Sequence, residues 1–102
     1  MNDRTVLRPD ETAPDLASTS FLHTGEVLLG GYRTRDFVAS VRVLDAVAEV
    51  AEALNHHPDV QLGWGRISFE LSSHDVGGVT HRDLRLAREI DRIARELGAE
   101  PD

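Results

Sequence analysis

Three histidines in two short polar motifs are the residues of this chain most suited to chemistry. His56 and His57 are adjacent in the run Glu52-Ala-Leu-Asn-His-His-Pro58, and His74 follows in the run Ser72-Ser-His-Asp75. Imidazole has an unperturbed pKa of about 6.5, so it can donate or accept a proton near neutral pH. If the two motifs meet, one group could protonate a leaving hydroxyl while another removes a proton elsewhere. The motifs therefore indicate proton transfer on a small molecule.

Hydroxyl, amide and carboxylate groups surround these histidines. The candidates are Glu52, Asn55, Ser72, Ser73, Asp75 and Asp83. Asp83 stands three residues after Thr80, the spacing of a helix capping box, so it would stabilise a helix start whether or not it takes part in chemistry. A metal site is the rival interpretation. Metal-binding histidines on a helix usually lie four residues apart, and the chain has no cysteine, so we expect no metal.

A helix over residues 36–54 must position the adjacent histidines. Its apolar residues follow a spacing of three and four; they are Phe37, Val41, Leu44, Ala48 and Ala51, with Val47 and Leu54 widening the stripe. Asn55 and Pro58 end this helix, because proline cannot continue it. The two histidines then lie at a helix C-terminus, where the dipole favours a protonated imidazole by about 0.3–1 kcal/mol.

A hairpin must bring His74 back to that helix end. Apolar residues alternate with polar ones over residues 60–64 and 67–71, with Gly65 between them, which predicts two half-buried antiparallel strands. We expect Trp64 to pack in the core. Gly77 and Gly78 predict a turn, and a second helix follows over residues 80–97. Its apolar stripe is Leu84, Ala87, Ile90, Ala94 and Leu97.

The remaining elements complete an α+β fold. Residues 26–33 predict a strand with a bulge or bend at Gly30 and Gly31, and residues 21–24 a short strand beside it. Residues 1–19 have prolines, acids and no periodicity, so we expect a flexible leader, with one domain over residues 20–102. Strands, helix, hairpin and helix in this order predict an antiparallel sheet covered by helices on one face.

Composition excludes several classes of protein. The chain has 102 residues and a net charge of −7, and the acid excess argues against nucleic-acid binding. No apolar stretch reaches the roughly 18 residues of a membrane span, and the first 20 residues lack the apolar core of a secretory signal. A cytoplasmic location is therefore the default expectation. A domain of this size often forms oligomers to bury more surface.

The motifs together resemble those of the pterin-4a-carbinolamine dehydratases, also called 4a-hydroxytetrahydrobiopterin dehydratases. The resemblance covers about residues 32–97. It rests on Asp36-Phe37, residues 48–52, Asn55-His-His-Pro-Asp59, Trp64, Leu71-Ser-Ser-His-Asp75, Gly78, and Thr80 with Asp83. It implies a four-stranded antiparallel sheet with helices on one face, and a homodimer or homotetramer. The implied reaction is dehydration of 4a-hydroxytetrahydrobiopterin to quinonoid dihydropterin and water, in tetrahydrobiopterin recycling, without metal or organic cofactor.

The resemblance also implies roles for the site residues. His56 and His74 would be the acid/base groups that flank the 4a-hydroxyl, and His57 would hold the pterin ring. Asn55, Ser72, Ser73 and Asp75 would contact the ring, while Glu52 and Asp83 would orient or polarise the histidines. The chain departs from the family toward its N-terminus. The usual tryptophan before the first strand is missing, with Phe21 as the candidate replacement, and Tyr32-Arg33-Thr34 stands where the family has Phe-x-Phe. The alternative is a non-catalytic binding or assembly protein that acts through protein–protein contacts.

Overall fold

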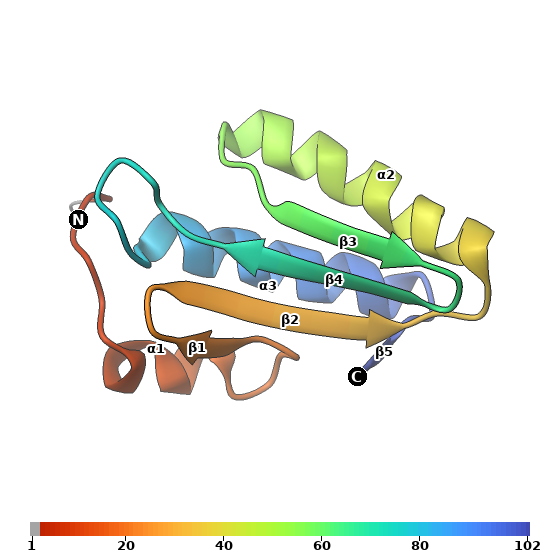
Figure 1. Cartoon of the computed structure of the whole chain (residues 1–102), viewed down its shortest axis with the longest axis horizontal. Helices are drawn as coiled ribbons and strands as arrows, with labels where there is room; N and C mark the ends of the chain where they lie inside the picture. Colours follow the sequence, from red (N-terminus) through yellow and green to blue (C-terminus); the bar gives the residue numbers. More distant parts are fainter. Residues whose placement is uncertain (1–2) are drawn as a thin grey trace.

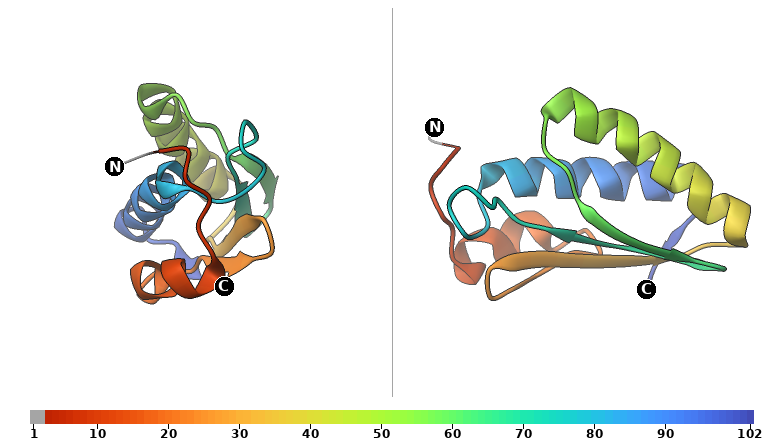
Figure 2. Two further views of the ribbon diagram at one scale, coloured as in Figure 1. Left: turned by 90° about the vertical axis from the view of Figure 1, so that its left-hand side faces the viewer. Right: turned by 45° about the horizontal axis from the view of Figure 1, so that its top comes forward.

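The computed structural model describes residues 3–102, in which three helices and five strands form an α+β fold (Figure 1). In chain order the elements are α1 (Pro9–Leu16), β1 (Leu22–Thr24), β2 (Val27–Arg33), α2 (Phe37–Leu54), β3 (Asp59–Gly63), β4 (Arg66–Leu71), α3 (His81–Glu96) and β5 (Glu100–Pro101). The predicted fold class is confirmed: the sheet is antiparallel, and α2 and α3 cover one of its faces (Figure 2). None of the described helices is long and apolar enough to cross a bilayer.

The sheet has the strand order β1-β2-β4-β3. These are the four predicted strands. A fifth, β5, pairs with Tyr32 and Arg33 of β2 on the edge that β1 also uses. The sequence did not predict β5, because two residues that include Pro101 carry no periodic signal. The outer edge of β3 has no strand partner among the described residues, so one edge of the sheet is open.

Alternation along the strands builds the core as predicted. The buried apolar side chains of the strands are Leu28, Tyr32, Ile67, Phe69 and Leu71. The expected bulge at Gly30 is wrong, because β2 pairs with β4 without interruption from Leu28 to Arg33. Gly30 instead lets the Phe21 ring approach the sheet: a Cβ atom at this position would lie 2.6 Å from the ring. The glycine is there for packing rather than for a bend.

The buried face of α2 differs from the predicted stripe. Ser40, Val43, Val47 and Ala51 are the buried residues, whereas Phe37 and Ala48 are exposed. Apolar residues occur on nearly every side of this helix, so spacing alone allowed two orientations. Ser40 selects one: its Oγ lies 3.0 Å from the Gly63 carbonyl oxygen and 3.1 Å from that of Arg66, at the β3–β4 turn. A buried hydroxyl needs such a partner.

The expected unstructured leader is wrong over Pro9–Leu16, which forms α1. Pro9 begins the helix, and the Arg8 backbone N–H donates to Glu11 Oε1 at 2.8 Å. Both features are favourable at a helix start. Leu16 is buried in the same core as the sheet, and α1 contacts β1 and α3. The folded unit therefore begins before residue 20.

Two residues at one end of the molecule are more exposed than predicted. Trp64 at the β3–β4 turn is 74% exposed rather than packed in the core, and Leu97 after α3 is 50% exposed. The rest of the predicted α3 stripe is buried. Trp64 lies in the β3–β4 turn beside Gly65, whose φ is +77°.

Candidate active site

The C-terminus of α2 places the adjacent histidines, as predicted. Asn55 adopts the left-handed conformation with φ of 51°, a geometry that asparagine tolerates better than most residues. The His56 backbone N–H then donates to the Ala51 carbonyl oxygen at 3.0 Å, which closes the last turn of the helix. The chain leaves the helix at this point, so the two histidine side chains point in different directions.

The segment after β4 brings His74 to the same place. Ser73 N–H donates to the Gly78 carbonyl oxygen at 2.8 Å, and Gly77 N–H donates to the Ser73 carbonyl oxygen at 2.9 Å. Gly77 has φ of +69°, which favours glycine. We name residues 73–78 the His74 turn. His74 itself is exposed and has no side-chain hydrogen bond to any residue from 3 to 102.

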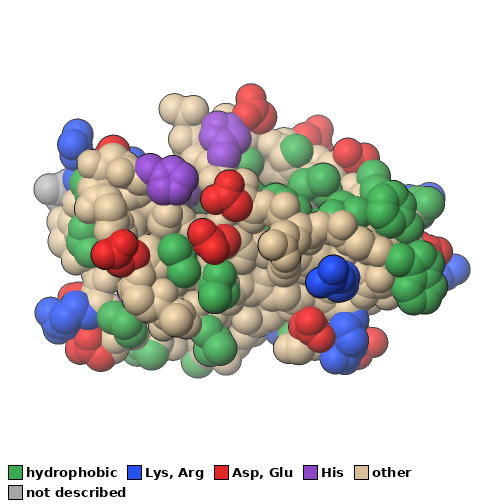
Figure 3. All heavy atoms as spheres, in the orientation of Figure 1, with side chains coloured by type: hydrophobic (Ala, Val, Ile, Leu, Met, Phe, Trp, Pro, Cys, Tyr) green, Lys and Arg blue, Asp and Glu red, His purple; other side chains and the backbone are tan. Residues whose placement is uncertain are grey.

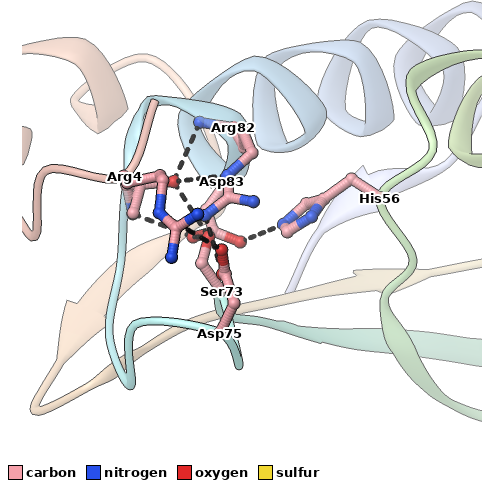
Figure 4. Close-up of polar contacts among 7 residues, drawn as sticks. Arg4, His56, Ser73, Asp75, Arg82 and Asp83 are labelled. Carbon is pink, nitrogen blue, oxygen red and sulfur yellow. Dashed lines mark hydrogen bonds and ion pairs between the residues drawn. The ribbon is translucent and has the colours of Figure 1, made fainter. Parts of the chain in front are cut away.

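A buried carboxylate orients His56. Asp83 is fully buried, and its Oδ1 lies 2.5 Å from His56 Nε2 (Figure 4). Its Oδ2 accepts from Ser73 Oγ at 2.8 Å and from the Thr80 backbone N–H at 2.9 Å, which confirms the predicted capping box. A carboxylate only accepts, so the His56 proton lies on Nε2. His56 Nδ1 is therefore the nitrogen left for a ligand.

His57 has a carboxylate partner of its own, but in solvent. Its Nε2 is hydrogen-bonded to Glu52 Oε2. The two side chains are 55% and 76% exposed, whereas the His56 side chain is only 12% exposed. The structure thus gives the neighbouring histidines different surroundings, with one held from inside the fold and the other held at its surface.

The three histidines line one pocket of about 340 Å³. Its wall consists of Asn55, His56, His57, Pro58, Asp59, Ser72, Ser73, His74, Asp75 and Arg82. Three residues in this wall were not predicted as site residues. Pro58 and Asp59 belong to the motif that starts at Asn55, and Arg82 stands next to Asp83, so their nearness to predicted residues was the only available signal. A larger hollow of about 600 Å³ lies on the open sheet face, but it contains no histidine.

Two residues that the resemblance assigns to pterin contact are already engaged within the protein. Ser73 is 1% exposed, and its hydroxyl contacts Thr80 Oγ1 at 2.8 Å as well as Asp83. The Asp75 carboxylate accepts from Arg82 Nη2 at 2.8 Å, and this hydrogen bond holds the pKa of Asp75 below its usual range. Ser73 therefore supports the site through Asp83, because its hydroxyl is buried and already hydrogen-bonded.

The donor groups do not form a metal site. Across residues 3–102, no three histidine, cysteine, aspartate or glutamate side chains gather as metal ligands would. The nearest groupings are the two histidine–carboxylate pairs, in which each imidazole Nε2 already faces an oxygen.

Comparison with known proteins assigns the chain to a family. Residues 8–93 match the profile described as pterin 4 alpha carbinolamine dehydratase. The chain belongs to this family. A Nocardia farcinica protein named for the family is 35% identical over 95 residues, which cover 93% of this chain and 95% of that protein. A relative from Thermosynechococcus vestitus, named in the same way, is 33% identical over 86% of this chain and 94% of its own length.

Solved structures support the same fold. A Brucella melitensis protein described as a transcriptional coactivator/pterin dehydratase superposes with a TM-score of 0.81 at 26% identity, over 88% of this chain and 99% of that one. A pterin dehydratase-like protein described as a RuBisCO assembly factor of the alpha-carboxysome has a TM-score of 0.63 at 20% identity, over 76% and 92%. The second likeness concerns the fold alone.

Proposed function

We propose that the protein dehydrates 4a-hydroxytetrahydrobiopterin to quinonoid dihydropterin and water. One observation carries the proposal: an imidazole oriented by a buried carboxylate shares a pocket with a second imidazole whose side chain has no hydrogen-bond partner among residues 3–102. His56 and His74 are the acid/base pair. Catalytic histidines in many enzymes are oriented by a carboxylate in this way, which fixes the tautomer.

The reaction needs two proton transfers. One imidazole donates a proton to the 4a-hydroxyl, the C–O bond breaks, and water leaves. A second group takes a proton from the neighbouring ring nitrogen, and the electron pair of that N–H bond forms the new double bond. Protons and electrons balance, so the reaction consumes no oxidant or reductant and calls for no cofactor. Preorganised groups within hydrogen-bonding reach typically accelerate such steps by about 10²–10⁴-fold.

The other wall residues bind the ring in this proposal. His57, held by Glu52, contacts the pterin from the rim, and Asn55 and Ser72 offer hydrogen bonds to its polar edge. Asp83 contributes through His56 rather than by contact, because it is fully buried.

Dehydration of synthetic 4a-hydroxytetrahydropterin tests the proposal. The rate with protein is compared with the rate without it, and we expect His56→Ala and His74→Ala each to lower kcat by about 100-fold or more. His23→Gln is the control, since its ring lies at α1 and the β1–β2 turn. Full activity in the double variant His56→Ala/His74→Ala would reject histidine catalysis. A wild-type protein that leaves the rate unchanged would instead favour the alternative, a non-catalytic binding or assembly protein.

We also propose that the protein forms a homodimer or homotetramer. Phe37, Val38 and Trp64 are at least half exposed, at 50%, 57% and 74%. The backbone N–H of Thr34 donates to the Gly65 carbonyl oxygen at 2.9 Å and brings the start of α2 beside the β3–β4 turn. Figure 3 shows apolar side chains gathered at this end. A second copy of the chain would cover them.

A further inference from the structure

The segment of residues 3–7 lies outside the part of the chain that matches the family, which begins at residue 8. In the structure it runs beside the His74 turn and contacts it at several points (Figures 1 and 4). We call residues 3–7 the N-terminal clamp.

Two contacts of the N-terminal clamp fix the base of the His74 turn. The Leu7 backbone N–H donates to the Val79 carbonyl oxygen at 2.8 Å. Val6 packs directly on Gly78, where a Cβ atom would lie only 2.8 Å from Val6 Cγ1. Gly78 is buried as a result. The absent side chain of this glycine is what allows the clamp to approach so closely.

Ion pairs at Asp75 act on the other end of the turn. Arg82 Nη2 donates to Asp75 Oδ1 at 2.8 Å, and Arg4 Nε lies 4.0 Å from Asp75 Oδ2 (Figure 4). The Arg4 side chain is 70% exposed, so solvent screens this longer pair. The packing of Val6 and the Leu7 hydrogen bond therefore stabilise the position of the His74 turn more than the Arg4–Asp75 ion pair does.

His74 depends on these contacts because its own side chain has no hydrogen bond within the described part of the chain. Its position is set by the backbone of the turn alone. We propose that the N-terminal clamp positions the His74 turn for catalysis, with Val6 as the main positioning residue. This inference rests on the proposed dehydration, in which His74 acts as an acid/base group.

The first test compares Val6→Ala with Leu22→Ala in the full chain. Both are exposed apolar residues, Val6 at 51% and Leu22 at 71%, but Leu22 lies on β1. We expect Val6→Ala to raise amide hydrogen exchange at Ser73 and Gly77 about tenfold, with no change in α3 or β4. We expect kcat to fall by about tenfold with KM nearly unchanged, because small displacements of a catalytic group are costly. Leu22→Ala should leave exchange and kcat as in the wild type.

The second test is a double-mutant cycle with Gly78→Ala. The added methyl collides with Val6 Cγ1, so Gly78→Ala should push the clamp away and raise exchange in the His74 turn. In a Val6→Ala background the nearest remaining atom is the Cβ of residue 6, at 3.7 Å, which is an ordinary contact. The double variant should therefore equal Val6→Ala alone rather than add to it.

Three results would overturn the proposal: unchanged exchange at Ser73 and Gly77 in Val6→Ala, an equal rise of exchange across the core, or an undiminished effect of Gly78→Ala in the Val6→Ala background. Hydrogen exchange is measured without substrate. If the wild type proves inactive, the proposed dehydration fails while the exchange data still decide whether the clamp holds the turn.

Discussion

At the scale of single residues, Asp83 links the stability of the fold to the chemistry of the site. Its carboxylate caps α3, accepts the Ser73 hydroxyl and orients His56. His56 lies just after the end of α2, and its hydrogen bond to Asp83 fixes the orientation of the ring. Here the orienting group lies on the first turn of a helix whose inner face is buried, so its own position is well determined.

Asp83→Asn is expected to damage both stability and catalysis. An amide has one acceptor oxygen where the carboxylate has two, so at least one of the three donors loses its partner. We expect the free energy of unfolding to fall by about 1–3 kcal/mol and kcat to fall by about 100-fold or more, because the His56 tautomer is no longer fixed. Denaturant unfolding and steady-state kinetics measure the two effects.

Glu52→Gln is the matched control for that variant. The Glu52–His57 pair is exposed, so its loss should change the free energy of unfolding by less than about 1 kcal/mol. Its kinetic effect should appear in KM, since His57 binds the ring in the proposed function. A wild-type kcat in Asp83→Asn, or equal effects of both variants, would contradict the division of roles between the two histidines.

Tyr32 makes the free energy of unfolding depend on pH in the alkaline range. Burial raises the pKa of its phenol, and the hydrogen bond to Asp91 Oδ1 at 2.6 Å raises it further. Below an unfolded-state pKa of about 10 both states keep the proton, so the contribution to stability is fully present. Above it only the unfolded state loses the proton, so the free energy of unfolding falls as the pH rises.

The absorbance of tyrosinate reports the deprotonation of Tyr32 directly, because Tyr32 is the only tyrosine in the chain. We expect tyrosinate to appear above pH 10 together with the loss of native circular dichroism, not before it. Tyrosinate formation in a protein that keeps its native circular dichroism would refute the prediction.

At the scale of elements, neighbouring glycines in β2 have different tasks. A Cβ at Gly30 would lie 2.6 Å from the Phe21 ring in the core, whereas a Cβ at Gly31 would meet its nearest atom, Asp102 Cβ, at 3.6 Å. We expect Gly30→Ala to lower the free energy of unfolding by about 1–3 kcal/mol, as overpacking usually does. Gly31→Ala should have little effect. Thermal unfolding measures the stabilities of the two variants. Equal stabilities would contradict the packing role of Gly30.

At the scale of the whole molecule, the exposed apolar end is the feature that a single chain leaves unexplained. Light scattering should give a mass that is a multiple of the 11.3 kDa chain. Phe37→Asp should shift the protein toward the monomer, because it places a charge among exposed apolar groups. The helix itself should be unharmed, since an acid is favourable in the first turn. A wild-type protein that runs as a monomer would reject the proposed assembly.

Local patterns were sufficient for most of the fold. Alternation predicted β3 and β4, Asn55 and Pro58 predicted the end of α2, and the Thr80–Asp83 spacing predicted the start of α3. Local rules succeeded here because each depends on hydrogen bonds or side-chain directions within a few residues. They failed for α1, whose stability comes from packing against β1 and α3, and for the buried face of α2.

Sequence patterns identified the groups that are available: the paired histidines at a helix end, the third histidine after a strand, and the acids beside them. The tertiary structure decided how they are used. It placed Asp83 beneath His56, engaged the Ser73 hydroxyl with Asp83, and added Arg82 to the wall. It also set residues 3–7 against the His74 turn. These contacts join residues from separate elements, and only the packing of the whole chain fixes such distances.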